Sequence, residues 1–180
     1  MLVNGIMFNS EAWHSITDKD MVVLEKVDEA LLRGLLAAHT KTPLEALYLE
    51  TGSLPLRYIL KSRRIMYLHN ILKKDETELI RKIYETQKQN PTPGDFSELV
   101  RNDITEIGLN MSDLQISQLS KQKFKSIVKN KIKDAALNYL NGVKRGHSKM
   151  QSLSYETLQL QEYLNSPLFN NESRNLLLRL

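Results

Sequence analysis

Apolar residues recur at helical spacing along most of the chain. After Thr17, a set of apolar residues follows at steps of three and four, the period of one α-helical face: Met21, Leu24, Val27, Leu31 and Leu35. Thr17 and Asp20 have the spacing of a capping box, which predicts that a long helix starts there. From Ser120 the same period is most regular, and it predicts a second long helix whose apolar side is formed by Phe124, Ile127, Val128, Ile132, Ala135, Ala136, Tyr139, Leu140 and Val143.

Turn and capping residues divide the segment between these two helices. Pro43 is predicted to start a short helix, and Gly52 suits the left-handed position that ends it. Pro55 predicts a further, well-buried helix over about Leu56 to Lys73. Asp75 is expected to cap the next helix, which extends to about Gln87.

The strongest break in the helical pattern is the sequence Asn-Pro-Thr-Pro-Gly-Asp at 90–95. Beyond it, a helix is predicted from Asp95 to Ile107, closed by Gly108, and a short one from Ser112. No segment shows the clean alternation of apolar and polar residues that a strand requires. The pattern therefore predicts an all-α, multi-helix bundle-like fold.

Composition excludes several classes of site. The chain has no cysteine, so disulfides, thiolate metal sites and cysteine nucleophiles are ruled out. No apolar run reaches the roughly 18 residues that span a bilayer, so no membrane partner is expected. The first residues lack the basic region and cleavage site of a signal peptide. We therefore expect an intracellular protein.

Sites for catalysis or cofactors are not apparent in the sequence. The four histidines lie far apart, without the HExxH spacing of a zinc site, and no glycine-rich phosphate loop occurs. A polymerase needs closely placed aspartates to hold two metal ions, and no adjacent pair follows an apolar strand. His69, on an apolar helix, is interpreted as a core or boundary residue. No enzymatic activity and no cofactor are expected, and an independent hydrolase is disfavoured.

Positive charge is concentrated in two windows. Residues 121–149 hold nine lysines and arginines against the single acid Asp134, and 57–82 hold eight against three acids. Such segregation favours a polyanionic partner, although a solvated helix surface gives the same pattern. The candidate nucleic-acid-binding residues are Arg57, Lys61, Arg64, Lys121, Lys125, Lys129, Lys133, Lys144, Arg145, His147 and Lys149.

These candidates suit contacts to a nucleic-acid backbone. Arg57, Lys61 and Arg64 share one helix face, and the guanidinium fork grips phosphate oxygens in pairs. The later lysines flank an apolar face on both sides, and 144–149 adds a basic exit. Four aromatic residues are possible base-stacking groups, although core packing explains each of them better: Tyr58, Tyr67, Phe124 and Tyr139.

Several runs resemble the C-terminal region of LINE-type (non-LTR) retrotransposon reverse transcriptases, and together they extend over essentially the whole chain. They are Asn9-Ser10-Glu11-Ala12-Trp13, residues 42–52 (TPLEALYLETG), 55–59 (PLRYI), 63–68 (RRIMYL), 120–124 (SKQKF), 147–149 (HSK) and 160–169 (LQEYLNSPLF). The resemblance implies a parent enzyme, acting in the nucleus, that copies RNA into DNA at a nicked chromosomal target. Residues 1–14 then resemble the end of the thumb, 15–90 a helical linker subdomain, and 91–180 a basic helical subdomain that is expected to be truncated.

The chain departs from a full element of this family. It lacks the palm carboxylates and any nuclease, and without cysteine it has no Cys/His zinc knuckle. Two hypotheses follow. In the first, the chain is a non-catalytic module that binds template RNA or target DNA beside the polymerase domains of the parent. In the second, it is a structural adaptor, a helical scaffold whose apolar surface docks those domains, without binding nucleic acid alone. The apolar residues around Trp13 are either a packing anchor or, in a fragment, a surface that a partner domain covers. The sequence leaves its oligomeric state open.

Overall fold

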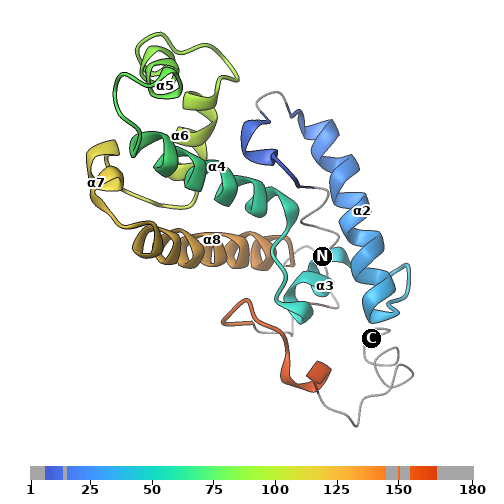
Figure 1. The fold of residues 1–180 in the computed structure, drawn as a ribbon. Coiled ribbons are helices and arrows are strands. Elements are labelled where there is room, and N and C mark those ends of the chain that lie inside the picture. The colour runs from blue at the N-terminus through green and yellow to red at the C-terminus, as the bar shows by residue number, and fades with distance from the viewer. Residues whose placement is uncertain (1–6, 14–15, 145–149, 151–154, 166–180) are drawn as a thin grey trace. The chain divides into compact units, whose positions relative to one another are not determined.

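The computed structural model describes residues 7–13, 16–144, 150 and 155–165, and every regular element within these ranges is helical (Figure 1). The all-α prediction is confirmed. The elements are η1 (Ser10–Ala12), α2 (Asp18–Leu36), α3 (Leu44–Thr51), α4 (Leu56–Leu72), α5 (Leu79–Gln89), α6 (Phe96–Glu106), α7 (Asp113–Gln118), α8 (Lys121–Lys144) and η3 (Glu162–Asn165). None of the described helices is both long and apolar enough to cross a membrane.

The chain forms two compact units, and each is built from two separate stretches of sequence. The first unit combines residues 1–18 with 57–135, and the second combines 19–56 with 136–180. Helix α8 contributes its first part to one unit and its last part to the other. The division at residues 14 and 90 expected from the sequence stays a prediction.

Helix α4 lies at the centre of the first unit. Its buried residues include Leu60, Ile65 and Leu68, as expected for a helix that is apolar around much of its circumference. The ring of His69 stacks on Phe124 of α8, with centroids 4.9 Å apart and planes at 15°. His69 Nε2 also lies 3.1 Å from the carbonyl oxygen of Leu119. His69 is thus a core residue, as the sequence indicated.

Helices α5 and α6 pack beside α4 around Phe96. Its ring meets Tyr67 and Tyr84 edge-on, at centroid distances of 5.6 and 6.4 Å. Asp95 caps α6 by accepting hydrogen bonds from the backbone N–H of Glu98 (2.8 Å) and of Thr92 (2.7 Å). One carboxylate thus orders the turn and starts the helix that follows it.

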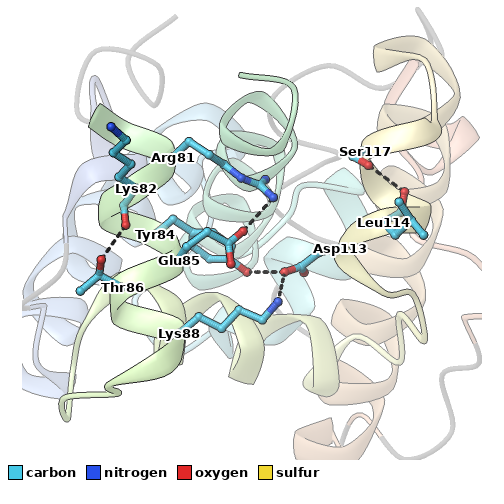
Figure 2. A network of polar contacts seen from close by, with 9 residues as sticks. All are labelled: Arg81, Lys82, Tyr84, Glu85, Thr86, Lys88, Asp113, Leu114 and Ser117. Atoms are coloured by element: carbon cyan, nitrogen blue, oxygen red, sulfur yellow. Dashed lines mark hydrogen bonds and ion pairs between the residues drawn. The ribbon is translucent and has the colours of Figure 1, made fainter. Parts of the chain in front are cut away.

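A polar network joins α5 to α7 (Figure 2). The Tyr84 hydroxyl donates to Asp113 Oδ2 at 3.1 Å, and Lys88 Nζ reaches the same oxygen at 2.7 Å. Burial, followed by the negative charge of Asp113, raises the pKa of Tyr84 well above its usual value, so the hydroxyl stays a donor. Ser112 and Gln115 form a capping box at the start of α7, where the sequence predicts a helix.

The second unit contains a buried carboxylate. The Tyr48 hydroxyl donates to Asp28 Oδ2 at 2.6 Å and joins α2 to α3. The Arg33 side chain donates to the carbonyl oxygens of His39 and Thr42, each at 2.7 Å, and holds the loop between the two helices. Gly52 ends α3 with a φ of 65°, as predicted, and a Cβ at this position would clash with the backbone of residue 159.

Three local predictions differ from the structure. Helix α5 starts at Leu79 rather than after Asp75, because Asp75 accepts hydrogen bonds from the N–H and hydroxyl of Thr77 in a tight turn. Pro43 was predicted as the first residue of the short helix, but it is the N-cap of α3, which begins one residue later at Leu44. On α2, two of the five residues expected to face the core, Val27 and Leu35, are exposed.

The shift on α2 has a simple cause. The buried side of this helix includes Asp28, Leu32 and Leu36, which follow one another at steps of four. The polar Asp28 is accepted in this row because Tyr48 provides its hydrogen bond. An apolar pattern alone does not reveal a carboxylate on the buried side.

Candidate nucleic-acid interface

Four lysines form an inclined row on the part of α8 that belongs to the first unit. The lysine row consists of Lys121, Lys125, Lys129 and Lys133, which follow one another every fourth residue. At a rise of 1.5 Å per residue, each step along the helix is about 6 Å. The first three are exposed and Lys133 is partly exposed. The row therefore presents positive charge at regular intervals along the flank of the buried residues of α8, and winds slowly around the helix axis with them.

A buried row next to the lysine row fixes its orientation. Phe124, Val128 and Ile132 are at most 1% exposed and hold α8 against the core. Lys125, Lys129 and Lys133 each follow one of these buried residues directly, so these lysines could turn inward only if the apolar row were exposed to solvent. The side of α8 that bears positive charge is thus determined by packing.

The charge of the first three lysines of the row is not neutralised by ion pairs within the part of the chain that the structure describes. The first turn of α8 contains no acidic residue, although a helix N-terminus favours negative charge. No ion pair forms with Lys121, Lys125 or Lys129 among the described residues. Like charges four apart on a helix destabilise it by roughly 0.2–0.5 kcal/mol per pair.

Two further lysines, Lys123 and Lys131, lie on the other flank of the buried row and are exposed. They were not among the residues selected from the sequence. The sequence could have identified them as surface lysines, because they belong to the same basic window and directly precede the apolar residues Phe124 and Ile132. With them, residues 121–135 carry six lysines and the single carboxylate of Asp134.

The basic residues of α4 have a different role. Arg64 is buried, and its guanidinium donates to both carboxylate oxygens of Asp103, at 2.7 and 2.9 Å. Lys61 pairs with Glu106 and lies over the ring of Tyr58, 5.3 Å from its centroid. The spacing of three residues between the cations on α4 matches that between the acids on α6. These charges join two helices and are not presented to a phosphate.

Arg57, the third basic residue predicted on this face, is partly exposed and has an interaction within the chain. The α4 face thus departs from the sequence interpretation, because Arg64 and Lys61 find acidic partners on α6. The neighbouring Arg63 bonds to the carbonyl oxygen of Met7 and secures the segment before η1.

The remaining predicted basic residues cannot be placed. Arg145, His147 and Lys149 lie outside the described residues, and so does the side chain of Lys144. The structure thus brings together four of the predicted residues, those of the lysine row, on one helix side.

The aromatic residues considered for base stacking are mostly core residues. Tyr58 and Phe124 are buried, and Tyr67 is engaged with Phe96. Tyr139 is 37% exposed. Phe124 is the sole aromatic residue of segment 121–135, and it is buried. The solvent side of this segment therefore carries lysines without an aromatic ring. This surface suits contact with a backbone better than stacking on bases.

Two apolar surfaces lie elsewhere on the chain. A groove of about 450 Å³ in the first unit is lined mainly by apolar residues of α4, α5 and α6, among them Tyr67, Ile80 and Ile83. In the second unit, α2 exposes Val23, Val27 and Leu35, at 62, 42 and 74%. Among the described residues, no three histidine or carboxylate side chains are grouped as a metal site would require.

Comparison with known protein families, with curated proteins and with solved structures found no match to this chain. The function is therefore argued from the geometry of the chain itself.

Proposed function

We propose that this chain is a non-catalytic nucleic-acid-binding module in which the lysine row of α8 contacts the backbone of RNA or DNA. One observation carries the proposal. The first three lysines of the row, Lys121, Lys125 and Lys129, flank a buried apolar row and form no ion pair with any carboxylate of the described residues. Fixed cations at regular spacing bind phosphates by releasing condensed counterions, and this binding does not depend on sequence.

The resemblance to LINE-type reverse transcriptases gives this proposal a setting. In a parent of that kind, the module would hold template RNA or target DNA beside the polymerase domains. The parent would supply the palm carboxylates, and this chain would contribute affinity rather than catalysis.

The test is the salt dependence of binding. Each phosphate contact contributes a slope of roughly −0.7 to −0.9 in log K against log salt. Replacing Lys121, Lys125 and Lys129 by glutamate should weaken binding to every RNA or DNA and reduce the slope by about two to three. The fold should persist, because acids near the start of a helix interact favourably with its dipole.

A matched control is available in the same unit. Lys73, Lys82 and Arg101 are exposed and scattered over α5, α6 and the loop before α5, and they form no ion pair with the described residues. Replacing these three by glutamate changes the net charge equally. If both triple variants lost the same amount of nucleic-acid binding, the lysine row would have no specific role in binding and the proposal would be wrong.

The second candidate function is a structural adaptor, and the exposed apolar side of α2 favours it. Val23, Val27 and Leu35 recur at multiples of four residues, as in a helix that packs against another surface. The expected occupant is a polymerase domain of the parent. Replacing these three residues by serine should leave nucleic-acid binding unchanged and abolish binding to that domain.

A further inference from the structure

The solvent side of α8 carries more than lysine. Directly opposite the buried row lies a polar row formed by Gln122, Ser126 and Asn130, all exposed. Residues four apart form parallel rows along a helix, and adjacent rows are separated by roughly 90° at the same height. The polar row is therefore central on the solvent side, with the lysine row on one flank and Lys123 and Lys131 on the other.

We infer that this part of α8 enters the major groove of a DNA duplex. This inference rests on the proposed function and specifies the nucleic acid. A helix with its side chains is about 10–12 Å across, and the major groove of B-form DNA is about 12 Å wide. A helix in that groove meets base edges with its central side and a phosphate strand on each flank. The rows of α8 occur in this order.

The side chains of the polar row suit the floor of the groove. Asparagine and glutamine pair with the N6 and N7 atoms of adenine, and serine bonds to donors or acceptors of either kind. Neutral amides and hydroxyls enter a groove without the repulsion that a carboxylate suffers between two phosphate strands. The polar row has no carboxylate until Asp134, its next member, which limits insertion to residues 121–133, about 20 Å of helix.

Other nucleic acids fit this surface less well. The major groove of an A-form RNA duplex is deep and narrow, and side chains cannot read it. Single strands are bound through aromatic rings on which bases stack, and residues 121–135 expose none. The central polar row also has no use in a purely electrostatic contact, for which lysines alone are sufficient.

The experiment compares three probes of one sequence with the full chain: duplex DNA, single-stranded DNA and duplex RNA. We expect duplex DNA to bind most tightly, by about tenfold over duplex RNA. In a methylation-interference assay on duplex DNA, methyl groups at guanine N7, in the major groove, should be excluded from the bound fraction. Methyl groups at adenine N3, in the minor groove, should be tolerated.

A neutral triple variant tests the polar row without changing charge. Replacing Gln122, Ser126 and Asn130 by alanine should weaken duplex DNA binding by about fivefold or more. The salt slope should stay the same, since no phosphate contact is lost. The control replaces three exposed residues elsewhere in the unit, Asn102, Asn110 and Gln118, and should change nothing.

The results distinguish failure of the major-groove placement from failure of nucleic-acid binding by the lysine row. Equal affinity for duplex DNA and duplex RNA, or interference at adenine N3, would overturn the major-groove placement while the lysine triple still flattened the salt slope. If the lysine triple and its control behaved alike on all three probes, the proposed function itself would fail.

Discussion

The imidazole of His69 lies nearly parallel to the ring of Phe124, with a centroid separation of 4.9 Å, and its Nε2 lies 3.1 Å from the carbonyl oxygen of Leu119. His69 is on α4, Phe124 is on α8, and Leu119 is the residue that ends α7. One side chain thus connects three helices at the point where the lysine row begins. The position of the proposed interface depends on this contact.

Replacing His69 by alanine should lower the free energy of unfolding by about 3 kcal/mol. The loss combines a cavity beside Phe124 with an unpaired carbonyl at Leu119. Urea unfolding measures it, with the exposed His39→Ala variant as control. A change within about 0.5 kcal/mol of the control would contradict the role assigned to His69.

Arg64 and Asp103 are expected to act as a structural pair. Removing one partner of a buried pair leaves an uncompensated charge, so Arg64→Leu should destabilise the fold by about 3 kcal/mol or more. The double variant with Asp103→Leu should recover a large part of that loss. Nucleic-acid affinity measured on folded Arg64→Leu should be unchanged. If Arg64→Leu kept the stability of the wild type but bound nucleic acid more weakly, Arg64 would be a phosphate-binding residue and not a structural one.

Burial raises the pKa of Asp28, partly opposed by the hydrogen bond from Tyr48, while the charge of Glu25 raises it further. The folded state therefore holds this proton more tightly than the unfolded state. The contribution of Asp28 is complete below the unfolded value of 3.8 and is lost as pH rises through the raised folded value. Stability at neutral pH should consequently increase in Asp28→Asn, whose amide oxygen still accepts from Tyr48.

The measurement for Asp28 is the urea midpoint at about pH 4 and about pH 7. The wild-type chain should lose more stability between these values than Asp28→Asn does. The exposed Glu156→Gln variant is the control and should follow the wild type. An Asp28→Asn variant that is less stable than the wild type at neutral pH would show that the ionised carboxylate is well solvated.

Asp95→Ala should cost about 1 kcal/mol, the usual contribution of an N-cap. Desolvation raises the pKa of Asp95, but hydrogen bonds from the backbone of Thr92, Glu98 and Ser97 and from the Ser97 hydroxyl outweigh it and lower the pKa. The stability from this ionised cap is present above the unfolded pKa and is lost as pH falls through the lowered value. Thermal unfolding should show a smaller effect for Asp75→Ala, since Asp75 caps no helix. Equal effects would contradict this assignment.

The sequence predicted those features that depend on neighbours within one or two turns. Gly52 and Gly108 end helices with φ of 65 and 64°, as predicted, because glycine adopts this left-handed conformation without strain. Asp95 was predicted as the first residue of α6 and is instead its N-cap. The sequence predicted lysines on both flanks of the apolar face of this helix, and the lysine row is one of these flanks. The prediction that Asp75 caps α5 was wrong, because its carboxylate accepts hydrogen bonds from Thr77 in a turn before the helix.

Long-range partners were not accessible from the sequence. Arg64 and Lys61 share a helix face as predicted, yet the acids that neutralise them lie about 40 residues later, on α6. Local spacing gives no information on such a partner. The buried position of Asp28 depends in the same way on Tyr48, twenty residues away. The number of basic residues in a sequence window therefore overestimates the number that are free to bind an anion, because some of them are paired with distant acids.

The central claim concerns which lysines contact nucleic acid, and the most direct measurement is the acylation of each lysine with and without DNA or RNA. Mass spectrometry of the full chain reports the reactivity of every lysine in one experiment. At low salt, Lys121, Lys125 and Lys129 should be protected several-fold by bound nucleic acid, and the exposed Lys73 and Lys82 should react unchanged. Uniform protection of all five lysines, or protection of Lys73 and Lys82 with none on α8, would contradict the account.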